Sequence, residues 1–406
     1  MRLIVIGGGA SGVFCAVTAA RLNPGLEVVL LEQSSQLLSK VRISGGGRCN
    51  LTHACEDIGT MIKNYPRGGN FLKRSFHHFF TTDTIEWFTQ RSVPLKTEAD
   101  GRMFPVSDRS ESIISCLVSE LNRFQVAVKM NAKVTAIHRK DKWQAELYSG
   151  EQLESEFLCV ACGGFPKTSM FEWLKQTGHT ISDPVPSLFT FNLHGHLITR
   201  LMGVAVQQVR IKIAGTKLVE TGPLLITHWG LSGPAVLKLS AWGARILKEA
   251  NYQYNISINW LPELTEVSLK EKLQEQRRSS GAASIQTRNP FGLPQRLWEF
   301  FLEQAAIPGT TRWADLTAEA QRKLMNSLLL SEFAVSGKTT FKEEFVTAGG
   351  ITLKEVNPAT MESRIADNLF FAGEILDVDG ITGGYNFQHA WTSGWIAGNA
   401  IASRSM

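Results

Sequence analysis

Three glycines near the beginning of the chain have the spacing of a phosphate-binding turn. Gly7, Gly9 and Gly12 follow a short apolar run and open a stretch rich in alanine. In this pattern the first glycine permits a tight turn, the second lets backbone N–H groups approach a pyrophosphate, and the third lets a helix pack on the preceding strand. The amino end of such a helix adds partial positive charge. The pattern predicts dinucleotide contacts at Gly7, Gly9, Ala10, Ser11 and Gly12.

An acidic residue stands where the next strand of this pattern should end. Glu32 follows a second apolar run and comes twenty residues after Gly12. Its carboxylate can accept hydrogen bonds from a ribose diol and would repel a 2′-phosphate. We expect further contacts with the same cofactor from Gln33, Val134, Ala161, Cys162 and Gly163.

A second glycine-rich segment combines flexibility with positive charge. Three consecutive glycines, 45–47, lie between Lys40 and Arg48. Successive glycines can bring bare backbone close to a planar ring or a phosphate. A flexible surface loop would look similar, but the polar side chains of Asn50 and Thr52 favour ligand contact. The contacts predicted here are Lys40, Ser44, Gly45, Gly46, Gly47, Arg48, Cys49 and Asn50.

A third segment, near the end of the chain, has groups suited to sugar hydroxyls. Glu374 and Asp377 follow a short apolar strand, where carboxylates can accept hydrogen bonds from ribityl or ribose groups. Gly384 then opens a helix rich in small residues, whose amino end would stabilise negative charge on a reduced flavin. Small residues also suit close packing of a buried helix, and both interpretations can hold together. The predicted contacts are Gly373, Glu374, Asp377, Gly384, Asn386 and Phe387.

Together, the first glycine turn and the C-terminal segment predict flavin adenine dinucleotide (FAD), held by a domain assembled from both ends of the chain. The sequence has no second G-x-G-x-x-G motif, so NAD(P)H is expected to bind only transiently, over the flavin. No catalytic acid, base or metal-ligand cluster stands out, and the catalytic residues stay unknown. Arg102 and His228 are candidates for substrate contact, although each could equally be a structural turn residue.

The charge balance describes a globular protein with a mildly basic surface. The chain has 42 Lys and Arg against 37 Asp and Glu, a formal net charge of +5, and its basic residues are scattered. A nucleic-acid-binding surface would favour clustering, so the charge neither demands nor forbids an RNA partner.

Cysteine spacing and hydropathy argue against a disulfide framework, a redox thiol pair and a membrane span. The six cysteines show no disulfide-framework spacing. Cys159 and Cys162 form a C-x-x-C pair, but on a strand their side chains would point to opposite faces, so a redox role is rejected. No stretch approaches the roughly 20 apolar residues of a membrane span, which predicts a cytoplasmic protein without membrane contact.

Helix and strand patterns suggest how these segments are positioned. Asp108 and Glu111 have the spacing of a capping box before a helix with apolar residues at helical intervals. Short apolar runs between 126 and 148 suggest an antiparallel meander, after which 157–161 rejoins the main sheet.

The chain changes character after a proline-rich segment. Residues 183–187 contain two prolines and should form a stiff linker. Beyond them, alternating patterns such as 209–213 predict half-buried strands of a separate β-rich domain. One helix should interrupt it, with Ser232 as its cap and Pro234 in its first turn. Residues 264–330 look helical.

Three runs resemble one known family. Residues 43–52 read ISGGGRCNLT, 227–234 read THWGLSGP, and 372–387 read AGEILDVDGITGGYNF. They are similar to the BaiN/RdsA-type (YhiN-like) NAD(P)/FAD-dependent oxidoreductases, which include aminoacetone-oxidase-like members, and the similarity spans most of the chain. The chain departs from the family at 161–164, where ACGG replaces an ATGG-like segment and the following loop is shorter. The substrate is therefore not inferred from other members.

The resemblance implies an α/β fold class with three domains. A glutathione-reductase-like Rossmann domain for FAD is built from both termini, residues 1–186 and 343–406. A β-barrel-like domain is inserted at 187–262, with a return at 331–342, and a small helical domain occupies 263–330. The same resemblance implies cofactor roles for Gly7, Gly9, Ser11, Glu32, Lys40, residues 44–50, Gly373, Glu374, Asp377 and Asn386.

The predicted function is an FAD-dependent oxidoreductase that transfers a hydride through flavin N5. One version is an NAD(P)H-dependent reductase of a C=C bond in a ring substrate, such as a nucleobase or a steroid-like molecule. An alternative is an amine (aminoacetone-like) oxidase that uses oxygen. A hypothesis of another class, supported only by the mild basic charge, is a non-catalytic flavin-bound module that binds RNA or protein. The oligomeric state is not predicted.

Overall fold

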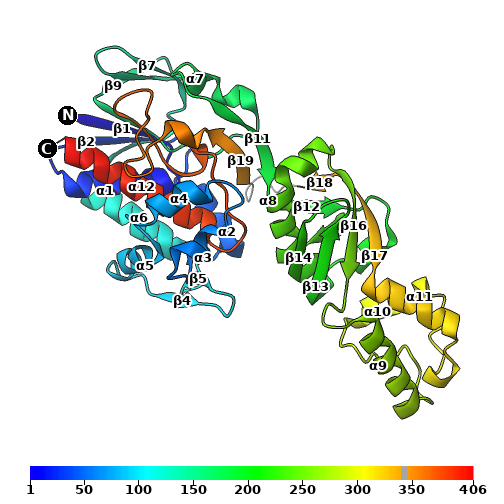
Figure 1. Ribbon diagram of the computed structural model, residues 1–406. Coiled ribbons are helices and arrows are strands. Elements are labelled where there is room, and N and C mark those ends of the chain that lie inside the picture. Colours follow the sequence, from blue (N-terminus) through cyan, green and yellow to red (C-terminus); the bar gives the residue numbers. More distant parts are fainter. Residues whose placement is uncertain (340–345, 406) are drawn as a thin grey trace. The chain divides into compact units, whose positions relative to one another are not determined.

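The chain divides into two compact units (Figure 1). The computed structural model describes residues 1–339 and 346–405. Unit 1 contains residues 1–187 and the described residues from 346 onward, whereas unit 2 contains residues 188–339. Unit 1 therefore unites both ends of the chain, and unit 2 is an insertion in its sequence. The predicted boundary between 342 and 343 lies outside the described residues.

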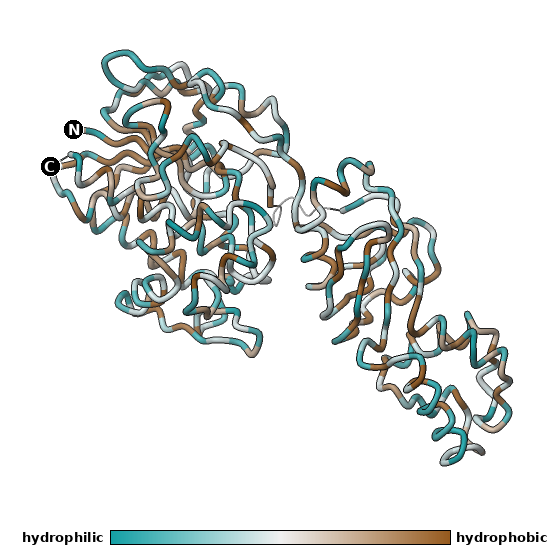
Figure 2. Tube along the Cα trace, viewed as in Figure 1, coloured by the Kyte–Doolittle hydropathy of each residue, from teal (hydrophilic) through white to brown (hydrophobic). Residues whose placement is uncertain are grey.

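Unit 1 is built on a five-stranded parallel sheet with the strand order β20-β10-β1-β2-β6. Apart from the exposed edge strand β6, its strands are short and mostly apolar without alternation, as expected for a parallel sheet that is covered on both faces. Figure 2 shows this hydrophobic character along the central strands. The arrangement confirms the predicted α/β Rossmann fold. In chain order, the strands are β1 (Arg2–Ile6), β2 (Glu27–Leu31), β6 (Ala127–Lys129), β10 (Phe157–Val160) and β20 (Leu369–Phe371).

Two helices from opposite ends of the chain pack against each other. They are α1 (Ala10–Leu22) and α12 (Tyr385–Arg404). A Cβ atom at Gly394 would lie 2.4 Å from the backbone oxygen of Ser11, and one at Gly398 would lie 2.6 Å from that of Cys15. The two helix backbones therefore approach too closely for any larger residue at these positions. Small residues on α12 thus let the two ends of the chain form one domain.

Smaller sheets and helices surround this core. The predicted meander needs two corrections, because β6 pairs in parallel with β2 in the central sheet, and an unpredicted strand, β9, completes the meander instead. The sheets are β7-β8-β9 (Val134–Arg139, Trp143–Leu147, Gln152–Ser155) and β3-β5-β4 (Thr52–His53, Arg102–Pro105, Leu95–Thr97). The helices are α2 (Ser39–Gly47), α3 (Ile58–Ile62), α4 (Gly69–Ser75), α5 (Thr81–Thr89), α6 (Glu111–Arg123) and α7 (Glu172–Lys175).

The predicted capping box is wrong. Ser110, not Asp108, precedes α6, and no side chain caps the helix there. Asp108 has φ +53 and forms an ion pair with Lys96 of β4. A contact between segments twelve residues apart therefore replaced the local cap that the spacing predicted.

The predicted linker at 183–187 is also wrong. These residues lie in β11 (Ile181–Ser187), which pairs antiparallel with β19 (Val346–Ile351). The register shifts between Ser182 and Val185, and this irregularity accommodates a proline that cannot donate a ladder hydrogen bond.

Unit 2 is built on a seven-stranded antiparallel sheet with the strand order β17-β16-β13-β14-β15-β12-β18. As the alternation predicts, Val209, Ile211 and Ile213 of β13 are buried, while Arg210 and Lys212 between them are exposed. The strands are β12 (Thr190–Asn192), β13 (Ala205–Ile213), β14 (Val219–Ile226), β15 (Gly230–Ser232), β16 (Gln253–Asn259), β17 (Ser331–Ser336) and β18 (Lys338–Thr339).

Four helices share one apolar core with this sheet. Pro234 begins α8, as predicted, but Ser232 belongs to β15 and Gly233 precedes the helix without a side-chain cap. The helices are α8 (Pro234–Glu249), α9 (Glu266–Ser279), α10 (Gln295–Gln304) and α11 (Ala318–Leu329).

Candidate cofactor site

The glycine turn after β1 leaves one stretch of backbone open. A Cβ atom at Gly7 would lie 2.5 Å from the backbone oxygen of Ala161, and one at Gly12 would lie 1.9 Å from that of Gly7. A Cβ atom at Gly9 would meet no atom within 4 Å. Gly9 directly precedes α1, whose first amides have no acceptor within the helix. Bare, open backbone at the amino end of α1 fits a phosphate group.

Glu32 is bonded to this turn. One carboxylate oxygen accepts a hydrogen bond from the Gly8 amide at 2.8 Å, and the other accepts one from the Ser34 amide at 2.8 Å. Each oxygen keeps a second acceptor position, so the carboxylate is still compatible with a ribose diol. The Glu32 carbonyl also accepts from the Ala132 amide, which brings the beginning of β7, with Val134, near the end of β2. The predicted neighbour Gln33 is exposed.

The triple-glycine segment forms a non-helical kink at the end of α2. Ser44 has an extended ψ of 148°, and Gly45, Gly46 and Gly47 then have φ values of +58°, +69° and +84°. Cβ atoms at Gly46 and Gly47 would meet nothing within 4 Å, whereas one at Gly45 would lie 3.0 Å from the Phe104 ring. The bounds of α2 include this segment, but Ser44, Gly45 and Gly46 have non-helical φ and ψ values and form a kink there. The open backbone of Gly46 and Gly47 fits contact with a planar ring.

The next two residues connect this segment to the interior. Cys49 is buried, and burial raises the pKa of its thiol to about 12, so it is not a thiolate nucleophile near neutral pH. The Asn50 amide, with its nitrogen facing Thr52, donates to the Thr52 carbonyl at 3.3 Å and accepts from the Gly384 amide at 3.0 Å. Gly384 precedes α12, so Asn50 bridges the N-terminal segment and the C-terminal helix.

The turn after β20, which continues into η5 (Gly373–Ile375), is held from both α1 and α12. Ser11 donates to the Ala372 carbonyl at 3.2 Å, and the Gly373 amide donates to Ser393 Oγ at 2.8 Å. His389 Nε2 lies 3.1 Å from the Gly373 carbonyl oxygen. Burial lowers the pKa of His389 to about 4, so the ring is neutral near pH 7. The contacts from His389 and Ser393 were not predicted, although polar residues four apart on a small-residue helix face were a usable signal.

Glu374 joins predicted residues from the two ends of the chain. One of its oxygens lies 2.5 Å from Lys40 Nζ, and the other accepts from the Thr347 amide at 2.8 Å. Asn386 bonds both the amide and the carbonyl of Gly380, at 2.8 Å and 2.9 Å, and so shapes the segment before α12.

The other predicted contacts lie after β10, after η5 and on α12. Ala161 is buried after β10, and burial raises the pKa of the neighbouring Cys162 thiol to about 12. A Cβ atom at Gly163 would lie 3.9 Å from a Glu374 oxygen. The Asp377 amide donates to the Ile351 carbonyl. Phe387 stacks on Trp391 of α12, with 5.8 Å between the ring centres.

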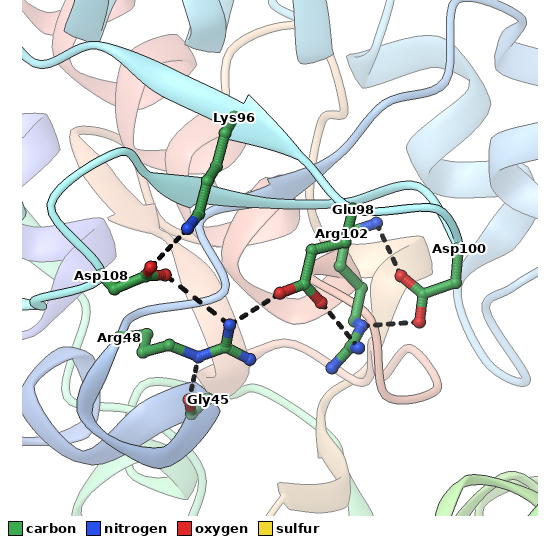
Figure 3. Close-up of polar contacts among 7 residues, drawn as sticks. All are labelled: Gly45, Arg48, Lys96, Glu98, Asp100, Arg102 and Asp108. Atoms are coloured by element: carbon green, nitrogen blue, oxygen red, sulfur yellow. Dashed lines mark hydrogen bonds and ion pairs between the residues drawn. The ribbon is translucent and has the colours of Figure 1, made fainter.

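The two substrate candidates belong to different units. Arg102 lies on β5 in unit 1, where it pairs with Glu98 and Asp100 (Figure 3). His228 is an exposed residue of unit 2 and packs on Trp229, with 3.7 Å between the ring centres. Among the described residues, no three His, Cys, Asp or Glu side chains converge on a possible metal ion. No helix in residues 1–339 or 346–405 is long and apolar enough to cross a membrane.

Comparison with known families agrees with this geometry. The profile of the HI0933-like protein Rossmann domain matches residues 1–400. The chain belongs to this family. Its membership confirms the resemblance drawn from the three sequence runs and identifies the chain as an FAD-dependent oxidoreductase, the class predicted from its two ends.

Two relatives match along their full length. The chain is 29% identical over 411 residues to the 3-dehydro-bile acid delta(4,6)-reductase of Clostridium scindens, covering 99% of both proteins. It is 31% identical over 412 residues to the ribosomal RNA dihydrouridine synthase of Escherichia coli, covering 99% of this chain and 98% of the relative.

Solved structures share the fold at low sequence identity. A 3-ketosteroid-delta4-(5alpha)-dehydrogenase from Rhodococcus jostii is 14% identical, with a TM-score of 0.51, covering 98% of this chain and 96% of that one. A flavocytochrome c3 fumarate reductase is 14% identical, with a TM-score of 0.52, covering 100% of this chain and 78% of that one.

Proposed function

We propose that this oxidoreductase reduces a C=C bond in a ring substrate and takes its electrons from NAD(P)H. The observation that carries the proposal is the open backbone at Gly9 and at Gly46–Gly47 in unit 1. Near these glycines, Ser11 donates to the Ala372 carbonyl and Lys40 forms an ion pair with Glu374, so both segments contact the C-terminal part of the chain. These positions fit a cofactor with a pyrophosphate and a planar ring. FAD has both.

Different residues of the site would contact different parts of FAD. In this proposal, the amino end of α1 at Gly9–Ser11 holds the pyrophosphate, and Glu32 accepts the ribose hydroxyls. The bare backbone of Gly46 and Gly47 contacts the ring, while Glu374 takes ribityl hydroxyls. The amino end of α12 at Gly384 favours negative charge beside it.

The chemistry of the cofactor explains why no catalytic cluster is needed for electron transfer. FAD supplies two-electron transfer in the form of a hydride. Reduction of a C=C bond adds a hydride to one carbon and a proton to the other, and oxidation of NAD(P)H to NAD(P)⁺ provides the hydride equivalent. The protein residues bind and orient the reactants.

The names of the relatives support this reaction type. One relative is named as a reductase of a bile acid at positions 4 and 6, and the other as a synthase of dihydrouridine, whose ring has two more hydrogens than uridine. Both names describe saturation of a ring.

The first part of the unit 2 sequence is basic, which is compatible with an anionic substrate. Residues 188–262 contain seven Lys and Arg but only two Asp and Glu. Arg210 and Lys212 are exposed two residues apart on one face of β13, and Lys217 is exposed in the turn that follows. Uridine within RNA is the first substrate to test, with an unsaturated 3-oxo steroid for comparison.

Anaerobic mixing of the FAD-loaded protein with NADPH or NADH tests the proposal. Loss of the flavin absorption band, followed by its return on adding a uridine-containing ribosomal RNA fragment or an unsaturated 3-oxo steroid, is the expected result. If neither dinucleotide bleaches the flavin, but small amines in air yield peroxide, the protein is an oxidase instead. Failure to bind FAD at all would reject both enzymes.

A further inference from the structure

Arg48 follows the triple-glycine segment and is held in a chain of alternating charges (Figure 3). Its Nη1 atom lies 2.6 Å from Glu98 Oε1 and 3.6 Å from Asp108 Oδ1, and its Nε donates to the Gly45 carbonyl at 3.3 Å. The guanidinium group lies over the Phe104 ring, 4.0 Å from its centre. The Arg48 side chain therefore folds back onto the first of the three glycines.

Glu98 binds two arginines with one carboxylate. Its Oε1 faces Arg48, and its Oε2 lies 2.8 Å from Arg102 Nη2. Arg102 also lies over the Phe104 ring, 5.6 Å from its centre. Without the carboxylate, two guanidinium groups would share one aromatic ring and repel each other.

The backbone around Glu98 is itself fixed. Gly101 donates to the Glu98 carbonyl at 2.9 Å, and Glu98 donates to the Arg102 carbonyl at 2.8 Å, which closes the turn between β4 and β5. The carboxylate is thus presented from a tight turn of the small β3-β5-β4 sheet. Its side chain is 28% exposed, so water only partly screens its ion pairs.

The same region holds the glycine segment at both ends. The Phe104 ring packs against Gly45, and the Ser110 amide donates to the Gly47 carbonyl at 2.8 Å. Ordering three consecutive glycines costs conformational entropy, so these contacts must offset that cost. Gly46 and Gly47 are left with open backbone between the two anchors.

We propose that Glu98 is a positioning residue for the cofactor segment. By holding Arg48 and Arg102 on Phe104, it fixes the Gly45 carbonyl and keeps Gly46 and Gly47 in the conformation that contacts the flavin. The proposal rests on the proposed function only in naming FAD as the ligand. The ordering of residues 44–50 by Glu98 can be measured in the flavin-free protein.

Glu98→Gln, with Asp100→Asn as a matched control, tests this role. Asp100 pairs with Arg102 but has no bond to Arg48 or to the glycines in the contacts described for it. Hydrogen exchange of peptides covering 44–50 is measured on the flavin-free protein, and the FAD dissociation constant by titration. We expect E98Q to speed exchange in this segment alone and to weaken FAD binding by roughly three- to tenfold, with D100N like wild type.

A double-mutant comparison makes the result decisive. Arg48→Gln should speed exchange as E98Q does, and the combined variant should add little, because both changes break the same link. Unchanged exchange in E98Q, or equal effects of E98Q and D100N, would overturn the proposal. If wild type binds no FAD, the proposed function fails while the exchange comparison still decides the role of Glu98.

Discussion

Gly9 and Gly12 lie three residues apart in one turn, but their surroundings are opposite. A Cβ atom at Gly9 would meet nothing within 4 Å, while one at Gly12 would lie 1.9 Å from the Gly7 carbonyl oxygen. One glycine thus leaves room for a ligand, and the other permits the turn to close. Mutation can separate these two roles.

Gly9→Ala should impair binding without harming the fold. Its backbone, with φ −83°, suits any residue, so the flavin-free protein should melt within about 2 °C of wild type. The added methyl group would occupy the space assigned to the pyrophosphate, and we expect roughly tenfold weaker FAD binding. Gly12→Ala is the matched comparison, with a stability loss of about 1–3 kcal/mol or more from overpacking. Wild-type FAD affinity in G9A would contradict the assignment.

Gly394→Ala tests the contact that joins the two ends of the chain. The new methyl group would lie 2.4 Å from the Ser11 carbonyl oxygen and 3.2 Å from the Phe14 side chain, so α1 and α12 must separate. We expect a loss of about 1–3 kcal/mol in the free energy of unfolding, measured in urea. Ser403→Ala, on an exposed position of α12, should change it by less than about 0.5 kcal/mol. Equal stability of the two variants would refute the close-packing argument.

The success of the sequence predictions depended on how local each signal was. The turn at Gly7–Gly12 is specified by its own spacing, and uninterrupted apolar runs such as those of β1 and β10 are typical of strands in a buried parallel sheet. The cap at Asp108 failed because Lys96, on strand β4, forms an ion pair with it. Residues 183–187 form a strand because β19, more than 150 residues later, pairs with them.

The candidate site shows the same limit. Its glycines and carboxylates are visible as motifs, since each residue type has a direct reason to face a nucleotide. Glu98, His389 and Ser393 instead contact residues of the site: Glu98 pairs with Arg48, and His389 and Ser393 bond Gly373. No sequence spacing links Glu98 to Arg48. The contact between Glu98 and Arg48 exists only once the fold brings their two segments together, so local patterns could not reveal it. The four-residue spacing of His389 and Ser393 on one helix was the one usable signal among these supporting residues.

Arg67 and Asp379 form an ion pair in the interior of unit 1 that mutation can break or replace. Asp379 is fully buried, bonds Arg67 through both carboxylate oxygens, and accepts from Ser187 Oγ at 2.8 Å. Arg67→Met would leave a buried carboxylate without its cation, and we expect a loss of about 3–5 kcal/mol in urea unfolding. The double variant Arg67→Met, Asp379→Leu should recover part of that loss, because no charge then stays buried. A double variant no more stable than R67M would contradict this explanation.

His389 should make stability depend on pH. Because burial lowers its pKa from 6.5 to about 4, the unfolded chain binds a proton between these values that the folded chain does not. The contribution of His389 to the free energy of unfolding is therefore fully present above about pH 6.5. It is lost as the pH drops toward 4, by at most about 3 kcal/mol. Urea unfolding of the flavin-free protein between pH 7.5 and about 4.5 measures this loss.

His389→Gln isolates that effect, because glutamine can still donate to the Gly373 carbonyl but does not titrate. Wild type should lose stability faster than H389Q as the pH falls, so the difference between them should shift in favour of the variant. His138→Gln, at an exposed position, is the control and should follow wild type throughout. If the free energy of unfolding falls equally with pH in wild type and H389Q, the buried imidazole is not the group responsible for the pH dependence.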